Sequence, residues 1–398
     1  MFELNSKYGE VKVYAETIEE EAIGQISQIA NSPIGEDAHI RIMPDAHAGK
    51  GCVIGTTMKF TNKICPNIVG VDIGCGVVAY QLAQQNIDLE ELDKFCRTKV
   101  VSGQNVRSKA VNLKMQEGWL PDLYCWDALK NHDRLYKSLG TLGGGNHFIE
   151  LNRAENGSYW LLVHSGSRNL GKQVAEFYQE LAEVTFKDRV NAEKLDLIES
   201  LKLQGRQSEI QTELAKIKEY VPNGLEYLRG GNAKDYLHDM AICQVWANEN
   251  RRVIAEDIIK GMNWGYVDRI ESIHNYINLE DGFIRKGAIA AHKGMPCLIP
   301  LNMRDGTLIC VGKGNEDWNY SAPHGAGRLM SRGRAKKEIK LEDFQETMKD
   351  VYSSTVCQAT IDESPFAYKD MEEIMKAVEP TVDIVERIIP VYNYKATS

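Results

Sequence analysis

Short apolar runs alternate with turns rich in glycine and aspartate over residues 38–80, and this pattern predicts a series of strands. The runs are HIRIM, CVIGTTMKF, IVGVDIG and VVAYQL. Apolar residues recur at helical spacing over 172–262, where we expect almost continuous helix. The strand pattern returns over 265–312, and the C-terminal segment ERIIPVYNYKATS is predicted to be extended.

Shorter elements complete this pattern. Residues 1–30 indicate a short strand followed by a helix, and further helices are predicted over 88–97 and 122–138. The stretch SYWLLVHSGSRNLGKQVAEFYQELAEV predicts a strand, a loop and a helix. Strands and helices do not alternate regularly enough for a doubly wound sheet. We therefore expect an α+β fold, with central β-sheets flanked by helices, and a single domain over residues 1–398.

One part of the helical region is strongly charged. Residues 186–219 keep apolar positions at helical spacing, which predicts a projecting helical hairpin that turns near Gly205. The hairpin would form an insertion over about residues 180–225. A solvated structural hairpin is the simpler interpretation, and an arm that contacts RNA or a partner protein is the alternative.

Composition limits the cellular setting. The 398 residues carry a net charge of −9, whereas proteins that coat nucleic acid non-specifically are basic, so any nucleic acid should bind a local basic groove. Apolar runs are too short to span a bilayer, and the acidic, mixed N-terminus indicates neither a signal nor a transit peptide. Nine cysteines without a CxxC pair indicate free thiols and a cytoplasmic protein.

Five of the nine histidines fall in turns rich in glycine, asparagine or serine beside predicted strands. They are His47, His147, His164, His274 and His324. Catalytic groups concentrate on such loops, because a rigid sheet positions them while the loop leaves access. A single histidine there is more often a hydrogen-bonded structural residue, but five together favour a functional site.

The motif GVDIGCG places Asp72 and Cys75 between glycines at the end of a predicted apolar strand. Turn glycines can aim both side chains at one point. A carboxylate, a thiolate and several imidazoles suit Zn²⁺, Mn²⁺, Co²⁺ or Fe²⁺ better than Mg²⁺ or Ca²⁺, and a thiolate can bridge two ions. The simpler interpretation is a turn-capping Asp72 and a buried Cys75, but the other motifs of the chain favour a metal site.

Two further loops indicate phosphate binding. In GTLGGGNHFIE, the glycines can expose backbone N–H groups to phosphate, although the GK[ST] ending of a P-loop is missing. If 147–151 is a strand, Asn146 and Glu150 share one face while His147 points to the other. A nucleotide could then bind on one side of this loop and a metal ion on the other.

The second loop, HGAGRLMSR, places His324 just before a predicted helix, whose N-terminus would favour an anion. Arg328 and Arg332 are four residues apart, hence on one helix face, and two arginines suit phosphodiester recognition. These features predict that His324 faces phosphate.

The motifs PDAHAGKG, VGVDIGCG, GTLGGGNHFIE, HSGSRNLG, RKGA, HGAGRLMSR and SPFAYKD follow one another in this order. Together they resemble the RtcB family of RNA-splicing ligases, nearly from end to end. The resemblance implies an RtcB-type fold and an enzyme that joins RNA 3′-phosphate or 2′,3′-cyclic phosphate ends to 5′-hydroxyl ends. It implies GTP and two Mn²⁺ ions as cofactors. GTP would guanylylate a histidine, GMP would pass to the RNA 3′-phosphate, and the 5′-hydroxyl would displace GMP.

The resemblance also implies residue roles. His324 would carry GMP, with Asp45 and Lys286 as further catalytic residues. One ion would bind Asp72, Cys75 and His147, and the other would bind Cys75, His164 and His274. The nucleotide would contact Asn146, Glu150, Gly325, Ala326, Gly327, Tyr368 and Lys395, among which Glu150 and Lys395 would read guanine and Tyr368 would stack on it. The phosphates or RNA ends would contact Arg168, Arg328 and Arg332.

Three positions depart from the family pattern. Residues 299–307, IPLNMRDGT, replace a Gly-Ser-Met-Gly-type loop, Ile284 replaces a histidine, and His292 is an unmatched extra that we expect to be structural or RNA-facing. The alternatives are a metal-dependent phosphodiesterase or phosphatase acting on RNA ends, and a non-catalytic RNA-binding or translation-associated protein. His324, Arg328 and the guanine-pocket residues favour the ligase. The sequence leaves open the physiological RNA, the metal used, the need for an activating partner and the oligomeric state.

Overall fold

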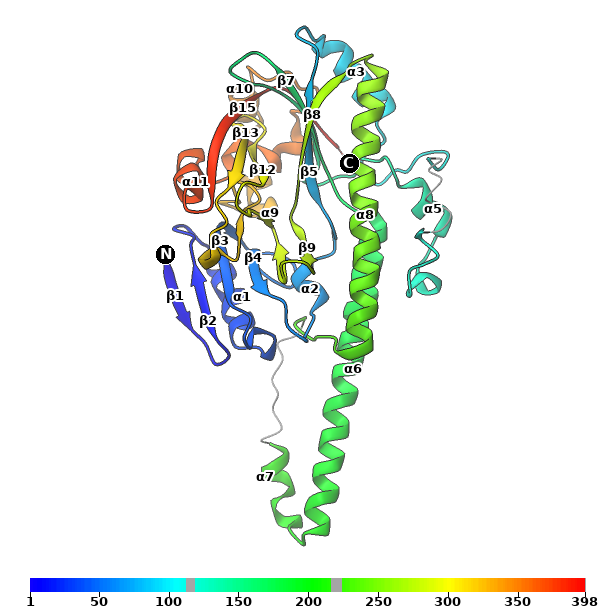
Figure 1. Cartoon of the computed structure of the whole chain (residues 1–398), viewed down its shortest axis with the longest axis vertical. Coiled ribbons are helices and arrows are strands. Elements are labelled where there is room, and N and C mark those ends of the chain that lie inside the picture. The colour runs from blue at the N-terminus through cyan, green and yellow to red at the C-terminus, as the bar shows by residue number, and fades with distance from the viewer. Residues whose placement is uncertain (112–118, 216–223, 398) are drawn as a thin grey trace.

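The computed structural model describes residues 1–111, 119–215 and 224–397, and it confirms a mixed α+β fold (Figure 1). One sheet has six strands, all antiparallel to their neighbours except the parallel pair β2 and β3. In spatial order, its strands are β1 (Phe2–Asn5), β2 (Glu10–Val13), β3 (Ile40–His47), β4 (Ile54–Lys59), β10 (Phe283–Lys286) and β9 (Asn275–Asn278).

The other large sheet has seven antiparallel strands. In order, they are β12 (Pro296–Asn302), β13 (Gly306–Gly312), β15 (Val382–Lys395), β6 (Phe148–Arg153), β7 (Tyr159–Ser165), β5 (Gly76–Leu82) and β8 (Tyr266–Ile273). The two edge strands approach one another, because the hydroxyl of Ser272 on β8 accepts a hydrogen bond from the amide of Leu298 on β12. The strands β11 (Ala288–Ala290) and β14 (Ser321–Pro323) pair with each other in a separate two-stranded antiparallel sheet.

Helices flank the sheets. The α-helices are α1 (Glu20–Ala30), α2 (Pro66–Val69), α3 (Leu89–Lys99), α5 (His132–Lys137), α6 (Arg168–Leu203), α7 (Ile210–Leu214), α8 (Gly230–Gly261), α9 (Arg332–Glu338), α10 (Leu341–Thr347) and α11 (Met371–Val378). The short 3₁₀ helices are η1 (Pro33–Gly35), η2 (Trp126–Ala128), η3 (Gln207–Glu209), η4 (Glu316–Trp318), η5 (Gln358–Glu363) and η6 (Pro365–Ala367). No helix in the described ranges is long and apolar enough to cross a membrane.

The helix α8 connects the two main hydrophobic cores. Its first half buries Tyr236 and Trp246 in the core that also contains residues of α1, α2 and the six-stranded sheet. Its second half buries Ile254 and Ile258 against the seven-stranded sheet. Figure 1 shows α8 running alongside both sheets. Because both cores pack on one helix, the ends of the two sheets are held in fixed relation to each other.

The predicted hairpin projects from this body. Helix α6 extends beyond the rest of the chain, the direction changes at Gly205 in a left-handed conformation (φ +71°), and α7 lies beside the far end of α6 (Figure 1). Only glycine adopts such a φ without steric cost. Part of the predicted insertion, residues 216–223, lies outside the described residues.

Several element predictions are wrong in detail. Residues 1–30 hold two paired strands before α1, instead of one. The predicted helix over 122–138 is only η2 and α5, because Asn131 between them is left-handed (φ +59°). The run IVGVDIG is not a strand: Pro66 occupies the first turn of α2, where its fixed φ suits a helix, and Gly70 then ends the helix.

Candidate active site

A cavity of about 790 Å³ opens where the two large sheets meet the loops of the predicted motifs. Its walls come from β3, β10, β6, β7, β12, β15 and the start of α9. Most of the predicted site residues line it: Asp72, Cys75, Asn146, Glu150, His164, His274, Lys286, His324, Gly325, Ala326, Gly327, Arg328, Arg332, Tyr368 and Lys395. Segments from every part of the sequence thus meet in one concave site, the usual setting of an active site.

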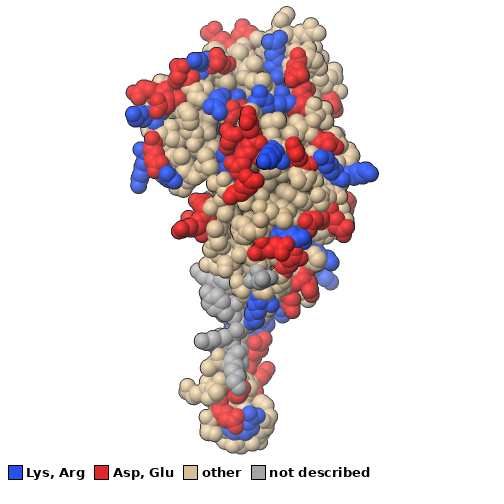
Figure 2. Space-filling view, turned by 90° about the vertical axis from the view of Figure 1, so that its left-hand side faces the viewer, with Lys and Arg blue, Asp and Glu red and all other residues tan. Residues whose placement is uncertain are grey.

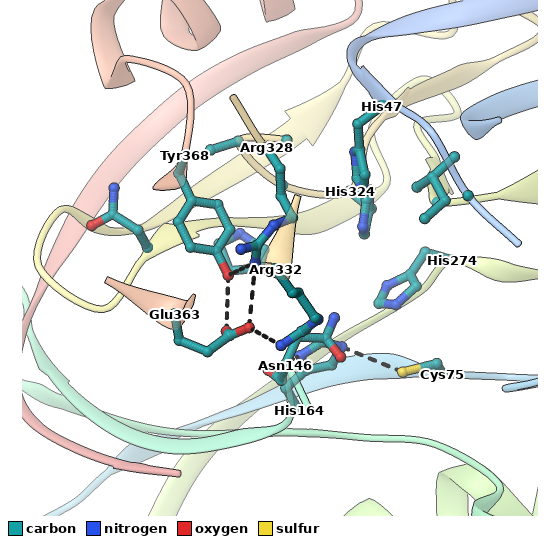
Figure 3. A pocket seen from close by; sticks show the side chains of 18 of the residues that line it. His47, Cys75, Asn146, His164, His274, His324, Arg328, Arg332, Glu363 and Tyr368 are labelled. Atoms are coloured by element: carbon teal, nitrogen blue, oxygen red, sulfur yellow. Dashed lines mark hydrogen bonds and ion pairs between the residues drawn. The ribbon is translucent and has the colours of Figure 1, made fainter. Parts of the chain in front are cut away.

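A thiol and two imidazoles converge at one end of this cavity. The Sγ of Cys75 lies 3.5 Å from the Nε2 of His147 and 3.3 Å from the Nε2 of His164. A carboxylate oxygen of Asp72 lies 3.0 Å from the same Nε2 of His147. Figure 3 shows Cys75 directed at His164, with His274 beside them. Cys75, His147 and His164 are close enough to ligate one ion together.

The hydrogen bond made by Nδ1 of each imidazole determines which ring nitrogen is available to a metal ion. Nδ1 of His147 lies 2.8 Å from the carbonyl of Leu142, and Nδ1 of His164 lies 3.2 Å from the carbonyl of Asn146. A carbonyl only accepts, so each Nδ1 carries a proton and donates it, and Nε2 is the nitrogen of each ring that can offer a lone pair to a metal ion. Burial lowers the pKa of His164 well below its usual value, which favours the neutral ring.

Lone pairs that face one another require a cation between them. Two imidazole nitrogens and a sulfur converge with a carboxylate, and burial together with Asp72 raises the pKa of Cys75 well above 9. Nearby metal charge would reverse that shift and yield the thiolate. The donor set therefore fits a transition-metal ion, and the hydrogen bonds to backbone carbonyls are those that orient metal-binding histidines.

His274 lies next to His164 and Cys75. Its ring centre is 5.3 Å from that of His164, and its amide donates a 2.9 Å hydrogen bond to the carbonyl of Cys75. Burial lowers the pKa of His274 well below its usual value, so this imidazole is also neutral. His274 is not part of the tightest cluster, but it faces the same cavity and is available to a second ion.

Helix α8 anchors the backbone around this cluster. The buried guanidinium of Arg251 donates to the carbonyls of Gly74 and Ser165, each 2.8 Å away and each adjacent to a cluster residue. The side-chain NH₂ group of Asn250 donates hydrogen bonds to the carbonyls of Thr141 and Gly166. The prediction that Cys75 ends an apolar strand is wrong, because it lies in the loop between α2 and β5, and this loop is held by α8.

His324 lies in the loop that follows β14, close to His274. Its Nδ1 lies 2.7 Å from Oδ2 of the fully buried Asp45, and the same oxygen accepts the amide of His324 at 3.1 Å. The carboxylate is acceptor-only when ionised, so Nδ1 carries the proton and Nε2 is left with a lone pair. The ring centre of His324 is 4.7 Å from that of His274. A nucleophilic nitrogen is therefore held beside the candidate metal site.

The local surroundings of His324 differ from the prediction. Helix α9 begins only at Arg332, with Ser331 as its cap, so neither His324 nor Arg328 lies at a helix N-terminus. The HGAGR motif instead follows β14. Pairing of β14 with β11 fixes the position of the backbone directly before His324. A side chain at Gly327 would come within 2.2 Å of the Asp45 carbonyl oxygen, so glycine there allows the close approach of the two segments.

Glu150 lies deep in the cavity wall on β6. Its two carboxylate oxygens accept from Asn152 at 2.9 Å and Asn393 at 2.7 Å. Burial raises the pKa of Glu150 to about 7. The two hydrogen bonds and the charge of Lys395 lower the pKa, but burial outweighs them. Asn146 and Glu150 both line the cavity and His147 does not, as their spacing predicted, although β6 begins only at Phe148.

Sequence reasoning missed the residue that gathers the predicted cations. Glu363, at the end of η5, is 3% exposed and binds Lys395 at 2.9 Å, Arg332 at 2.7 Å and Arg328 at 3.4 Å. The hydroxyl of Tyr368 donates to it at 2.8 Å. These contacts are drawn in Figure 3. Glu363 lies just before the SPFAYKD motif, and its only signal was that nearness.

Other predicted residues hold structural partners. The ammonium of Lys286 lines the cavity and donates to the carbonyls of Lys50 (2.9 Å) and Asn67 (2.8 Å). Arg168 donates to Thr141 and the carbonyl of Gly103, and it is not among the lining residues.

The unmatched His292 is held outside the cavity. It binds Asp281 at 2.9 Å and stacks on Tyr320, as expected of a structural residue.

The departing segment 299–307 is the hairpin between β12 and β13, and it forms one wall of the cavity. The carbonyl oxygen of the Asn302 side chain accepts the amides of Arg304 and Asp305, and its amide donates to Asp305 at 2.7 Å. All the polar groups of Asn302 are thus bound within the turn. This wall therefore presents mainly backbone and apolar groups to the cavity.

Figure 2 shows acidic and basic side chains interspersed on one face of the molecule, in keeping with the net charge of −9. The cavity lining is also mixed in charge: five basic residues, Lys50, Lys286, Arg328, Arg332 and Lys395, stand against five acidic ones, Glu19, Glu21, Asp72, Glu150 and Glu363. The predicted local basic groove is therefore not a net positive cavity, although its arginines and lysines are the groups that could contact a phosphorylated ligand.

A mixed α+β fold thus surrounds a cavity in which a Cys/His cluster able to hold a metal ion lies near a histidine bound to a buried carboxylate, an arrangement typical of an enzyme. A family model described as tRNA-splicing ligase RtcB matches residues 25–121 and 125–396. The RNA-splicing ligase RtcB of Escherichia coli strain K12 is 32% identical over 87% of each chain. The tRNA-splicing ligase RtcB of Nanoarchaeum equitans is 27% identical over 89% of this chain and 87% of that protein.

The chain belongs to the RtcB family, which confirms the resemblance drawn from its motifs. This membership supports RNA ligase as its class of enzyme.

Proposed function

We propose that this protein is a GTP- and Mn²⁺-dependent RNA ligase that joins 3′-phosphate or 2′,3′-cyclic phosphate ends to 5′-hydroxyl ends through guanylylated His324. The observation that carries the proposal is the pairing of His324 with buried Asp45 at the edge of the Cys75 cluster. A hydrolase that only activates water would need the metal cluster, but it would not need an imidazole oriented by a buried carboxylate beside it.

In the first step, the Nε2 lone pair of His324 attacks the α-phosphorus of GTP, an N–P bond forms, and the bond to the bridging oxygen breaks to release pyrophosphate. Asp45 keeps the proton on Nδ1 and stabilises the positive charge that develops on the ring. Mn²⁺, held by Asp72, Cys75, His147, His164 and His274, would supply positive charge for the oxygens of the reacting phosphate.

In the second step, an oxygen of the RNA 3′-phosphate attacks the phosphorus on His324, and the N–P bond breaks. The 5′-hydroxyl of the other RNA end then attacks the activated 3′-phosphate, loses its proton and releases GMP. A cyclic end must first be opened by water to the 3′-phosphate. Arg328, Arg332 and Lys286 lie in the same cavity, where their charges can hold the RNA phosphates.

The base would lie in the cavity beside the paired strands β6 and β15, which carry Glu150 and Lys395, and within reach of Tyr368, which lines the same cavity. Glu150 would accept from the guanine edge, Lys395 would donate to it, and Tyr368 would stack on the ring. Asn146 and the glycine-rich segment Gly325–Ala326–Gly327 would contact the phosphates and ribose.

The whole chain would act as one catalytic domain, with residues 180–225 as an insertion. We place it in the cytoplasm, a setting that suits its nine free cysteines.

A ligation assay tests the proposal. Two short RNAs, one ending in 3′-phosphate or 2′,3′-cyclic phosphate and the other starting with 5′-hydroxyl, should be joined with GTP and Mn²⁺. RNA with a 3′-hydroxyl end should not be joined, and ATP should not replace GTP. Cleavage of the phosphate from the RNA end without joining would instead support the phosphatase alternative.

Replacing Asp45 with asparagine should slow guanylylation of His324 by about 10²- to 10⁴-fold, as carboxylate loss does in other histidine-carboxylate pairs. The amide can present its NH₂ group to Nδ1, which would stabilise the wrong tautomer and place the proton on Nε2. The measurement is the rate of GMP transfer from labelled GTP in a single turnover. An unchanged rate would show that Asp45 does not orient the nucleophile.

Guanosine should bind more weakly as the pH falls below about 7. Because burial raises the pKa of Glu150 to about 7, the carboxyl becomes protonated in that range, whereas guanine donors require its ionised form. The affinity should fall by up to about tenfold per pH unit. Calorimetric titration with guanosine, without added metal, measures it, and Glu150→Gln should make the profile flat. A wild-type profile that is already flat between pH 5 and 8 would contradict the role of Glu150.

A further inference from the structure

The buried carboxylate of Glu363 joins two groups of residues in the cavity. One is Lys395, and the other consists of Tyr368, Arg328 and Arg332, which Figure 3 shows around Glu363. We infer that Glu363 is a positioning residue that makes the nucleotide pocket selective for guanine by holding Lys395 in place. This inference rests on the proposed function, since it assigns Glu363 a role in the same nucleotide site.

Lys395 depends on Glu363 for its position. Its ammonium lies in a side chain that is 5% exposed, and its other contacts are the Asn146 carbonyl at 3.5 Å and the ring of Phe148 at 5.3 Å. Within the described residues, Glu363 is the one carboxylate within 4.0 Å of this ammonium. A buried ammonium without a counter-charge is costly, so the Lys395 side chain would leave its present position if Glu363 were neutral.

Glu363 is itself kept ionised by its neighbours. Burial raises the pKa of this carboxyl, but Lys395, Arg332 and Arg328 outweigh burial and lower the pKa to about 2. The hydroxyl of Tyr368 donates to the same carboxylate, but the phenol ring is also held by Arg328, whose guanidinium lies 5.1 Å from the ring centre. Glu363 is therefore needed for the donor that would meet the base edge, whereas the ring that would stack on the base keeps a second contact.

The chemistry of the bases gives this arrangement its selectivity. Guanine presents a carbonyl oxygen at C6, which accepts from an ammonium, whereas adenine presents an amino group there, which does not. Lys395 therefore favours guanine only while it stays directed at the base. Loss of Glu363 should weaken binding of GTP and leave binding of ATP largely unchanged.

Loss of Glu363 should have the opposite effect on ligands that bind only to Arg328 and Arg332. Glu363 accepts from Arg332 and Arg328, which are also expected to hold phosphates. A neutral residue at 363 leaves these guanidinium groups with less negative charge around them, so a polyphosphate without a base should bind as well or better. Simple loss of structure would weaken binding of every ligand, so the two effects can be told apart.

The experiment measures GMP transfer to His324 over a range of GTP concentrations with Mn²⁺, and adds ATP or inorganic tripolyphosphate as competitors. For Glu363→Gln, the KM for GTP should rise by about 10- to 100-fold, the size expected for a lost hydrogen bond between charged groups. The inhibition constant of ATP should be unchanged, and that of tripolyphosphate should be unchanged or lower.

Asp362→Asn is the matched control. Asp362 binds Arg332 at 2.6 Å and Lys336 at 3.6 Å, and neither Lys395 nor Tyr368 is among its partners in the described structure. This variant should keep the wild-type preference for GTP over ATP. Lys395→Met should lower that preference, and adding Glu363→Gln to it should change the preference by less than about twofold, because the two residues act as one unit.

Two results would overturn the inference. One is a Glu363→Gln variant that keeps the preference for GTP over ATP, and the other is equal weakening of GTP, ATP and tripolyphosphate. If the wild-type protein transfers no nucleotide to His324, the proposed function fails and takes the inference with it. Normal transfer by the wild type with an unaltered Glu363→Gln variant would refute the inference alone.

Discussion

Replacing His324 with alanine should abolish the transfer of labelled GMP from GTP to the protein and reduce RNA joining by at least about 10³-fold. The side chain supplies the atom to which GMP would be bonded, and no other imidazole in the described cavity has its Nδ1 bound to a buried carboxylate. The measurement is protein-bound label after denaturing electrophoresis, together with ligation of 3′-phosphate RNA. Metal binding should persist, because the cluster around Cys75 is left intact.

His292→Ala is the control for this variant. His292 is also bound to a carboxylate, Asp281, but it lies outside the cavity. It should retain labelling and ligation. Equal labelling of the wild type and His324→Ala would show that another residue carries the nucleotide, and labelling of neither would remove the guanylylated histidine from the mechanism.

Replacing Cys75 with alanine should remove the metal and, with it, ligation. Cys75 is the residue that both His147 and His164 face, so its loss opens the centre of the cluster and leaves two imidazoles without their shared partner. Mn²⁺ affinity should fall by at least about 100-fold, the upper end of what outer residues of metal sites contribute. The measurement is metal per chain after dialysis, by mass spectrometry, and calorimetric titration with Mn²⁺.

Cys297→Ala is the matched control. Cys297 is fully buried in the core between β12 and β13 and is no part of the cluster. It should lower the free energy of unfolding by about 1 kcal/mol while the metal content stays the same. Binding of guanosine to Cys75→Ala should also persist, since Glu150 and Lys395 lie in another part of the cavity. A Cys75→Ala protein that keeps its full metal content would contradict the assignment.

The sequence by itself determined the local features of this protein. Period-two patterning predicted β3, β4 and β5, the segment before His164 as a strand, and the extended C-terminus that became β15. Asp88 and the charged turns of α3 mark a helix start that needs no distant contact. Loop chemistry also marked His324, Cys75 and the glycine-rich turn as candidates, and the ordered motifs identified the family.

Errors arose where neighbouring residues did not decide the conformation. The run IVGVDIG is apolar enough for a strand, but Pro66 starts a helical turn, and α8 fixes the loop that follows. The HGAGR motif lies close enough to α9 to suggest a helix N-terminus, but pairing of β14 with β11 and the approach of Gly327 to Asp45 hold it as a loop.

Only the tertiary structure decided how the site is assembled. Asp45 and His324 are 279 residues apart in the chain, and Glu363 meets Lys395 across 32 residues and Arg332 across 31. Their pairing depends on two sheets packing on α8, which sums many weak apolar contacts over the whole chain. Residue types and local spacing carry no record of that sum. They therefore named the groups able to bind metal, nucleotide and phosphate, but not Glu363, the carboxylate that binds Lys395, Arg328 and Arg332.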